Sequence, residues 1–236
     1  MWSSPRPRTP DDLGHAAAPA IEDRAGRGIM AGVNEQRPVI VSFRSLAQEV
    51  LAAERPRLVA VDGRGGSGKT TFASRLRRFL PSVAVIEIDD FINWSDLYDW
   101  WFRVEKEAIA PLLAGERARF RIRDWETDPL GASLGGWRDL GPAETIIVEG
   151  VTASRASIAQ RLSMSFWVEA SPDVRLARGV GRDGESMRPV WQNWMRLEDE
   201  FFERDDARGR ATYVVNGDTD VTHDGEAEVA VVLGAA

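Results

Sequence analysis

The sequence Asp62-Gly63-Arg64-Gly65-Gly66-Ser67-Gly68-Lys69-Thr70-Thr71 stands between an apolar run, Leu58 to Val61, and a helical pattern from Phe72 to Leu80. A strand, a glycine-rich loop and a helix form the context in which GxxxxGK[ST] predicts a phosphate-binding loop. Glycines let backbone N–H groups point at phosphate oxygens without an intervening Cβ, and the start of the helix adds partial positive charge. The stretch therefore predicts a site for a nucleoside triphosphate.

Two side chains of this loop carry its predicted chemistry. Lys69 is expected to reach the β- and γ-phosphates, and the Thr70 hydroxyl is expected to bind Mg²⁺. Lys69 and Lys106 are the only lysines of the chain, which makes an accidental match to the motif rarer. The alternative is an ordinary glycine-rich turn, which the flanking strand and helix disfavour. The predicted nucleotide-binding residues of the loop are Gly63, Gly65, Gly66, Ser67, Gly68, Lys69, Thr70 and Thr71.

Composition limits the class of protein. A chain of 236 residues is long enough for one α/β domain with a substantial core. The net charge of −7 argues against nucleic acid as the main partner, because a phosphate backbone attracts a basic surface. There is no cysteine, and His15 and His223 lie in polar surroundings, so no thiolate or histidine-centred site is expected. Without a signal segment or an apolar run of roughly 20 residues, we expect a cytoplasmic protein with no membrane partner.

Residues 1–37 are rich in Pro, Arg, Ala, Gly and Asp and show no sustained apolar period. Such a segment cannot bury enough apolar surface to offset the entropy of ordering. We predict a disordered tail here, followed by a single domain over residues 38–236. Met30 is an alternative natural start, and a targeting peptide is a further alternative that Asp11 and Asp12 disfavour.

Acidic residues end two further strands that are predicted from their apolar residues. The first strand runs into Asp89 and Asp90, and the second runs into Glu149. Ligands bind at the carboxyl ends of strands in open parallel sheets. We therefore predict that one of Asp89 and Asp90 accepts the proton of an attacking hydroxyl, and that the other, with Glu149 and Thr70, holds Mg²⁺ or its waters. The alternatives are an acid that only caps the next helix and an acid that only pairs with an arginine.

A tryptophan-rich segment, residues 94–137, separates these two strands. Residues 94–114 carry apolar side chains at helical spacing, and residues 117–123 alternate between arginine and apolar residues as in a strand. Residues 131–141 are expected to be irregular. The tryptophans can stack on a flat substrate such as a nucleobase or fill the core, and the sequence leaves both open.

A later helix is predicted to begin at Pro172. On it, Arg175, Arg178 and Arg182 are spaced to share one face, which is costly unless anions meet it. We predict that residues 179–208 form a helical lid that closes over the nucleotide and brings Arg178 and Arg182 to its phosphates. The alternative is a solvated charged helix.

Together the motifs resemble the uridine kinase family of P-loop nucleoside kinases, which is related to the phosphoribulokinases and pantothenate kinases. The resemblance covers roughly residues 57–218 and rests on DGRGGSGKTT, Asp89-Asp90-Phe91, Asp124-Trp125, IIVEG and RLARGVGRD. It implies a general base at Asp89, a substrate-side loop at Asp124 and a lid at RLARGVGRD. The implied fold is α/β, a three-layer α/β/α P-loop NTPase with a five-stranded parallel sheet in the order 2-3-1-4-5 and a helical lid.

We therefore expect an ATP- and Mg²⁺-dependent small-molecule kinase, with a nucleoside such as uridine or cytidine as acceptor. Nucleotide monophosphates, sugar phosphates and vitamin precursors stay open as acceptors, and so does the oligomeric state, a homo-oligomer included. The rival from another class is an ATP-gated binding protein or slow NTPase without an acceptor. The expected catalytic residues are Lys69, Asp89 and Arg182. The residues expected to bind the acceptor are Asp89, Phe91, Asp124, Trp125 and Arg188.

Overall fold

The computed structural model describes residues 38–94 and 100–233. The predicted disordered tail, residues 1–37, lies outside the described residues, as does a short piece of the tryptophan-rich segment, residues 95–99. Within the described ranges, no helix combines the length and the apolar character needed to cross a membrane.

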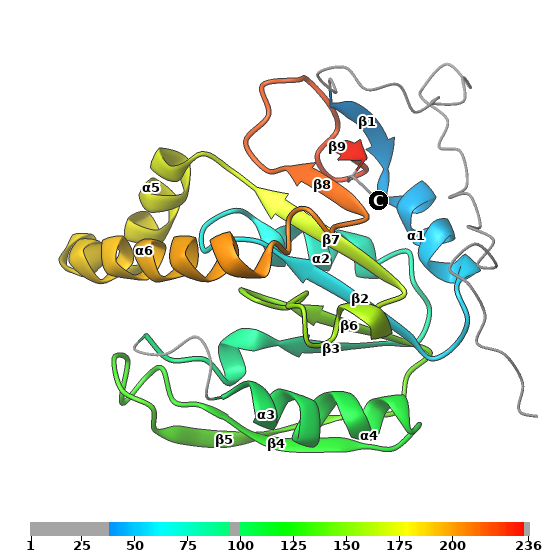
Figure 1. Ribbon diagram of the computed structural model, residues 1–236, viewed down its shortest axis with the longest axis horizontal. Coiled ribbons are helices and arrows are strands. Elements are labelled where there is room, and N and C mark those ends of the chain that lie inside the picture. The colour runs from blue at the N-terminus through cyan, green and yellow to red at the C-terminus, as the bar shows by residue number, and fades with distance from the viewer. Residues whose placement is uncertain (1–37, 95–99, 234–236) are drawn as a thin grey trace, which may run out of the picture. The chain divides into compact units, whose positions relative to one another are not determined.

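A seven-stranded sheet forms the centre of the described domain (Figure 1). Its strands are β1 Val39–Ser42, β2 Arg57–Asp62, β3 Val83–Glu87, β6 Thr145–Glu149, β7 Met164–Glu169, β8 Tyr213–Asn216 and β9 Glu228–Leu233. They lie in the order β1-β9-β8-β7-β2-β6-β3. The five strands from β8 to β3 are parallel, whereas β9 is antiparallel to β8 and β1 is antiparallel to β9.

The sheet differs from the predicted one in extent and direction. A five-stranded, wholly parallel sheet was expected, and the observed sheet is seven-stranded and mixed. The five strands that were expected are neighbours in the order β3-β6-β2-β7-β8. The two additional strands, β9 and β1, lie beyond β8, and Val39 of β1 lies opposite Val231 of β9. A four-residue strand has too little pattern of its own to be predicted, and its partner is at the far end of the described chain.

The longer helices follow the sequence prediction closely. They are α1 Phe43–Ala52, α2 Lys69–Arg77, α5 Pro172–Asp183 and α6 Arg188–Asp205. Helix α1 begins directly after Ser42, whose side chain accepts a hydrogen bond from the Ser45 amide at 3.0 Å. Such a cap satisfies one of the amides that a helix N-terminus leaves without an internal partner.

Helices cover both faces of the sheet. Adjacent residues of a strand point to opposite faces, so Phe166 and Trp167 of β7 mark the two sides. On one side, the Phe166 ring lies 5.0 Å from Phe72 of α2, which in turn lies 5.4 Å from Phe43 of α1. On the other side, the Trp167 ring lies 4.7 Å from Phe202 of α6. The domain therefore has three layers, α/β/α.

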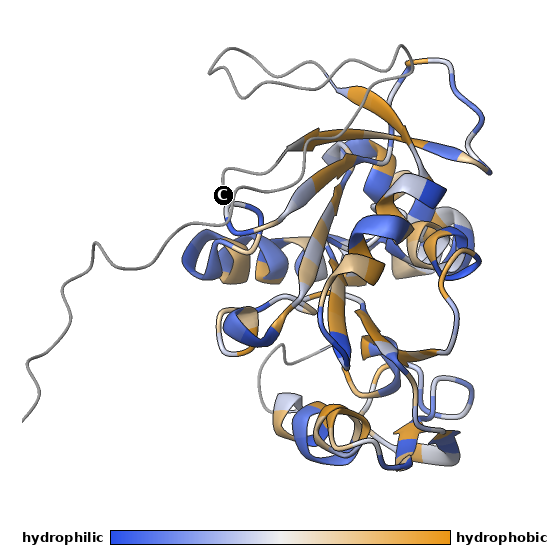
Figure 2. Ribbon diagram, turned by 90° about the vertical axis from the view of Figure 1, so that its right-hand side faces the viewer, coloured by the Kyte–Doolittle hydropathy of each residue, from blue (hydrophilic) through white to orange (hydrophobic). Residues whose placement is uncertain are grey.

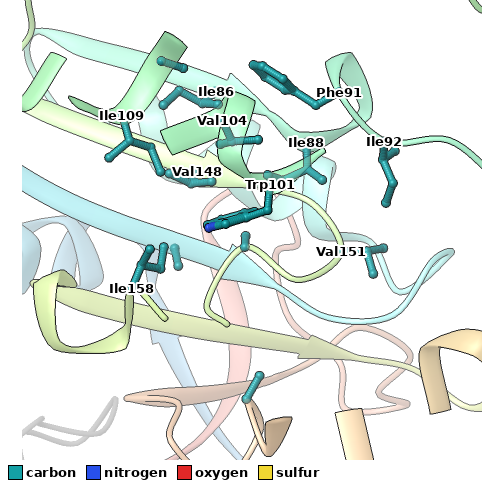
Figure 3. Packing of buried hydrophobic residues seen from close by; sticks show 14 of the residues in the cluster. Ile86, Ile88, Phe91, Ile92, Trp101, Val104, Ile109, Val148, Val151 and Ile158 are labelled. Carbon is teal, nitrogen blue, oxygen red and sulfur yellow. The ribbon is translucent and has the colours of Figure 1, made fainter. Parts of the chain in front are cut away.

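A helical segment after residue 100 covers the sheet near β3 and β6. It consists of α3 Trp101–Arg103, a π-helical turn η3 Val104–Ile109, and α4 Ala110–Leu113. Its Trp101, Val104 and Ile109 belong to the same buried cluster as Ile86 and Val148 (Figure 3). Full burial of side chains of this size contributes about 1.5–3 kcal/mol each. The hydropathy colouring shows the same division, with largely hydrophobic strands inside and hydrophilic residues on the helices (Figure 2).

Two further strands, β4 Ala118–Arg123 and β5 Leu134–Leu140, form a separate antiparallel hairpin. Strand β4 was predicted, but the expectation that residues 131–141 are irregular is wrong, because β5 occupies most of them. Strand β5 contains Gly135 and Gly136, and its side chains are exposed or half-buried. It therefore lacks the apolar alternation that signals a strand, and its pairing with β4 supplies the missing stabilisation.

Candidate active site

The glycine-rich loop joins β2 to α2 and lies tightly against its neighbours. Gly63, Gly66 and Gly68 have φ angles of 142°, 76° and 106°, a region that favours glycine. A Cβ on Gly63 would lie 2.0 Å from the carbonyl oxygen of Val168, and one on Gly66 would lie 2.5 Å from that of Arg175. The loop thus needs glycine at these positions to keep the conformation in which its amides gather at the start of a helix, as an anion site requires.

Lys69, Thr70 and Glu149 lie together where α2 begins. Lys69 is buried, and its ammonium group donates to the carbonyl oxygen of Arg64 at 3.0 Å. The Thr70 hydroxyl donates to Oε1 of Glu149 at 2.7 Å, while Oε2 of Glu149 is buried without a hydrogen-bond partner. Burial raises the pKa of Glu149, and the charge of Lys69 and the bond from Thr70 act against that rise.

Asp62, at the end of β2, is completely buried, and sequence reasoning assigned it no role. Its carboxylate accepts hydrogen bonds from the amide of Gly63 at 2.7 Å, the amide of Thr152 at 2.8 Å, and both the amide and the hydroxyl of Ser154 at 2.8 Å. Burial raises the pKa of Asp62, and these bonds oppose the rise. Asp62 therefore ties the start of the loop to the segment after β6. The available signal was an acid at the end of an otherwise apolar strand.

Asp89 lies in a 3₁₀ turn, η2 Ile88–Asp90, at the end of β3, and its side chain opens onto a cavity. Desolvation by the surrounding protein raises the pKa of Asp89, and the charges of Lys69 and Arg182 lower it. The backbone carbonyl oxygen of Asp89 accepts a hydrogen bond from Nε1 of Trp125 at 2.8 Å. This carboxyl group is therefore placed within the electrostatic reach of the loop lysine.

Asp90 has a different partner from its neighbour. It is buried, and its Oδ2 lies 3.0 Å from Nη1 of Arg138 in β5, which also lies 3.1 Å from Oε1 of Glu87. Burial raises the pKa of Asp90 to about 7, although the charge of Arg138 opposes the rise. Asp90 lines the same cavity, but its ion pair is with the hairpin. Its role as a metal ligand beside Thr70 and Glu149 stays a prediction.

A cavity of about 840 Å³ joins these groups, and four tryptophans form much of its wall. The ring centroid of Trp94 lies 6.1 Å from that of Trp125, 5.7 Å from that of Trp191 and 5.4 Å from that of Trp194, with edge-to-face geometry throughout. Trp125 belongs to the loop of the β4–β5 hairpin, whereas Trp191 and Trp194 belong to α6. All four rings line the pocket, and Trp191 and Trp194 also belong to the buried core cluster. Trp100 and Trp101 belong to that cluster without lining the pocket.

Most of the predicted nucleotide-binding residues surround this cavity. Those that line it are Gly65, Gly66, Gly68, Lys69, Thr70, Thr71 and Arg178. Gly63 and the fully buried Ser67 belong to the same loop but do not line the cavity.

The three arginines of α5 have separate surroundings, although they were expected to share one anion-binding face. Arg175 is buried and forms an ion pair with Glu198 of α6 at 3.2 Å. Arg178 donates to two carbonyl oxygens of the glycine-rich loop at 3.2 and 3.3 Å. Arg182 is exposed, lines the cavity and donates to Asp183 at 2.7 Å. Helix α6 packs against α5, so one of the three positions became interior.

Glu198 is the second important residue that sequence reasoning did not single out. Its side chain is completely buried. Oε1 accepts hydrogen bonds from the amide of Gly65 and from Nε1 of Trp194, both at 2.7 Å, and Oε2 accepts from Arg175 at 3.2 Å. Burial raises the pKa of Glu198, while Lys69 and these donors lower it. One acid in a helix rich in charged residues gives no signal in the sequence.

Three residues that were expected to bind the acceptor do not line the cavity. Phe91 is buried, and its ring lies 4.7 Å from that of Phe120 in β4. The carboxylate of Asp124 binds within its own loop, and Arg188 donates to Glu185 at 2.9 Å on the outside of the α5–α6 turn. Core packing holds the side chain of Phe91, and local hydrogen bonds hold those of Asp124 and Arg188, so their role in binding the acceptor stays a prediction.

A model of the AAA domain family matches residues 59–205. The chain belongs to this family. The match extends from β2 to the end of α6 and includes every residue of the cavity wall described above.

The AAA domain of this chain is similar to curated proteins of two kinds. The Arabidopsis thaliana protein named inorganic pyrophosphatase TTM2 is 29% identical over 136 residues, which make up 53% of this chain and 20% of that protein. The uridine kinase of Ureaplasma parvum serovar 3 is 23% identical over 148 residues, which make up 54% of this chain and 69% of that protein. The chain thus matches only a fifth of the length of the first relative.

A solved structure described as a possible uridine kinase from Bacillus stearothermophilus has a TM-score of 0.53 at 22% identity, and the match covers 73% of this chain and 96% of that one. At this identity the likeness is one of fold. The matches confirm the resemblance predicted from the motifs, and the AAA domain has the fold of the P-loop kinases of the uridine kinase group.

P-loop kinases in general use ATP together with Mg²⁺. Mg²⁺ at a phosphate site takes oxygen ligands and is held by one or two protein groups besides phosphates and waters. In this AAA domain, the Thr70 hydroxyl and the Glu149 carboxylate lie together at the start of α2, and Glu149 has a buried oxygen atom to spare. The residues therefore fit a nucleotide with Mg²⁺.

Proposed function

We propose that this protein transfers the γ-phosphoryl group of ATP to a hydroxyl group of a small molecule, with a nucleoside such as uridine or cytidine as the first acceptor to test. One observation carries the proposal. A single cavity is lined by Lys69 and Thr70 of the glycine-rich loop, by Asp89 at the neighbouring strand end, and by flat aromatic rings. These residues would bind phosphate, accept the proton of an attacking hydroxyl and stack on a planar acceptor.

The phosphate part of the mechanism needs charge neutralisation and positioning rather than covalent chemistry. Lys69 and the loop amides would hold the β- and γ-phosphates. Thr70 and Glu149 would hold Mg²⁺, which supplies further positive charge to the phosphates when bound. Arg182, exposed at the cavity, would add charge to the group in transfer.

The acceptor part depends on Asp89. Its carboxylate would take the proton of the acceptor hydroxyl as the oxygen attacks phosphorus. Desolvation by the surrounding protein raises the pKa of Asp89 above its usual value, which would make it a stronger base. The bond from Nε1 of Trp125 to the backbone of Asp89 would hold the turn in place.

The tryptophans support a planar acceptor. Trp94 and Trp125 meet edge to face, so their rings offer surfaces in two orientations beside Asp89. Aromatic surfaces of this kind bind a nucleobase by stacking. In this proposal Phe91 supports the turn of Asp89 from the core, and the segment 179–208 contains the parts that close over the nucleotide.

ADP release tests the proposal directly. The full chain is incubated with ATP and Mg²⁺ and with single members of a panel of nucleosides, nucleotide monophosphates, sugar phosphates and vitamin precursors. Uridine or cytidine is expected to accelerate ADP release at least tenfold and to appear as its phosphate ester by mass spectrometry. The absence of acceleration by every acceptor would contradict the kinase proposal.

A hydrolase without an acceptor is the second candidate. The similarity to the protein named inorganic pyrophosphatase TTM2 favours it. Phosphate release from ATP and from pyrophosphate, measured without any acceptor, decides between the two. Hydrolysis that no acceptor accelerates would favour this candidate.

A further inference from the structure

Helix α6 is bound to the glycine-rich loop through backbone and side-chain contacts. The Gly65 amide donates to Oε1 of Glu198 at 2.7 Å, and the Arg64 guanidinium donates to Asp199 at 2.8 Å. A Cβ built on Gly65 would lie 2.9 Å from the ring of Trp191 and 3.1 Å from the Glu198 carboxylate. Helix and loop therefore meet without space between them.

The Glu198 carboxylate is itself fixed from two sides. Nε1 of Trp194 donates to Oε1 at 2.7 Å, and Arg175 of α5 donates to Oε2 at 3.2 Å. Glu198 is completely buried, and 3% of Arg175 is exposed. A buried carboxylate is costly unless donors surround it, so its position is defined by these partners. It can hold the Gly65 amide in one place.

We propose that Glu198 is a positioning residue that sets the conformation of the phosphate-binding loop and, through it, the affinity for nucleotide. The inference rests on the proposed function only in that the loop binds nucleotide phosphates. The carboxylate joins the loop to α6 through Trp194 and to α5 through Arg175.

Two substitutions distinguish the hydrogen bond from the Gly65 amide from the negative charge of Glu198. Glu198→Asp keeps the charge but shortens the side chain by one methylene, so its carboxylate no longer reaches the Gly65 amide. Glu198→Gln keeps the length and an acceptor oxygen for Gly65 and Trp194 but loses the charge that pairs with Arg175. Glu200→Gln is the matched control, because Glu200 is exposed on the same helix and pairs only with its neighbour Arg196 among the contacts described.

Two measurements on the full chain read the position of the loop. Hydrogen exchange of a peptide covering residues 63–70, without nucleotide, reports on its amides, and calorimetry with ATP and Mg²⁺ gives the Kd. Glu198→Asp is expected to exchange faster and to raise the Kd about tenfold or more, as for the loss of a hydrogen bond to a charged group. Glu198→Gln is expected to stay within about threefold of the wild type in Kd, although unpaired Arg175 lowers its thermal stability. Glu200→Gln should match the wild type in both.

Wild-type exchange and Kd in Glu198→Asp would overturn the proposal, as would equal losses in Glu198→Asp and Glu198→Gln. If Glu198→Asp does not fold, Trp194→Phe replaces it, because it removes one donor that orients the carboxylate. Faster exchange of the loop peptide in Trp194→Phe supports the proposal, and unchanged exchange overturns it. Neither measurement needs an acceptor, so a failed acceptor screen would contradict the kinase proposal without affecting the proposal for Glu198.

Discussion

The phosphate side of the cavity is built mainly from one short stretch of the chain, whereas the acceptor side is assembled from several. The phosphate side comprises residues 63–71 and Glu149, which lie on the β2–α2 connection and on β6, the strand next to β2. The acceptor side comprises Asp89, Trp94 and the β4–β5 hairpin with Trp125, closed by two tryptophans of α6. Phosphate binding can therefore be recognised in a short motif, and acceptor selection cannot.

The two sides also differ in what their charged groups contact. On the phosphate side, Lys69 and Thr70 bond to oxygen atoms that line or support the loop. On the acceptor side, Asp90 and Glu87 both lie within 3.1 Å of Arg138, so they join the end of β3 to the β4–β5 hairpin. Part of the charge on the acceptor side is therefore structural. Substitutions on the two sides should therefore have distinct effects.

The largest effect is expected on the phosphate side, from Lys69→Ala. Loss of a charge aimed at the transferring phosphoryl group should lower turnover by about 10²–10³-fold or more. ADP release in the presence of the best acceptor measures it. Lys106→Ala is the matched control, since Lys106 is the only other lysine and is exposed. Comparable turnover in the two variants would remove Lys69 from the mechanism.

The next effect separates the two neighbouring acids of the acceptor side. Asp89→Asn should lower kcat by about 10²-fold or more, because the variant cannot take a proton, while the Kd of ATP stays unchanged. Asp90→Asn, whose side chain pairs with Arg138, should lower kcat by less than about tenfold. Steady-state kinetics and calorimetry give both quantities. Near-normal kcat in Asp89→Asn would show that another group accepts the proton.

A smaller effect is expected from the aromatic wall. Trp125→Ala should raise the KM of the acceptor about five- to tenfold without changing the Kd of ATP, because one stacking surface is lost. Trp137→Ala provides the control, since Trp137 lies in the same hairpin with 57% of its surface exposed and does not line the cavity. An equal change in both variants would mean that the hairpin acts only as a scaffold.

The smallest effect concerns the pH dependence of stability. Burial raises the pKa of Asp90 from its usual 3.8 to about 7, so the folded protein retains a proton that the unfolded chain releases near pH 4. The unfolded state then binds fewer protons between these values, and the contribution of Asp90 to stability falls as the pH rises from about 4 to about 7. Asp90→Asn lacks this fall. Its Tm relative to the wild type should increase by a few degrees between pH 4.5 and pH 8. A constant Tm difference across this range would place the pKa of Asp90 outside it.

Local patterns predicted the strand before the glycine-rich loop, the two strands that end in acids, and the helices after the loop and from Pro172, because each has a period or an apolar run of its own. Strand β2 is buried along its whole length, and its residues Leu58 to Val61 form a continuous apolar run. Strands β1 and β5 were missed because one is four residues long and the other is glycine-rich and largely open to solvent. Both are stabilised by pairing with another strand, β1 with β9 and β5 with β4. The residues of a strand do not by themselves indicate its pairing partner.

The amino-acid sequence by itself determined that a nucleotide-binding loop lies between a buried strand and a helix, and that acids end the neighbouring strands. These features depend on residue types and on short spacings, which can be recognised in the sequence without knowledge of the fold. Only the tertiary structure decided which acid pairs with Arg138, which arginine of α5 is interior, and that Glu198 reaches the loop from a helix more than a hundred residues later. Side-chain direction and burial result from packing between distant elements, so no local pattern records them.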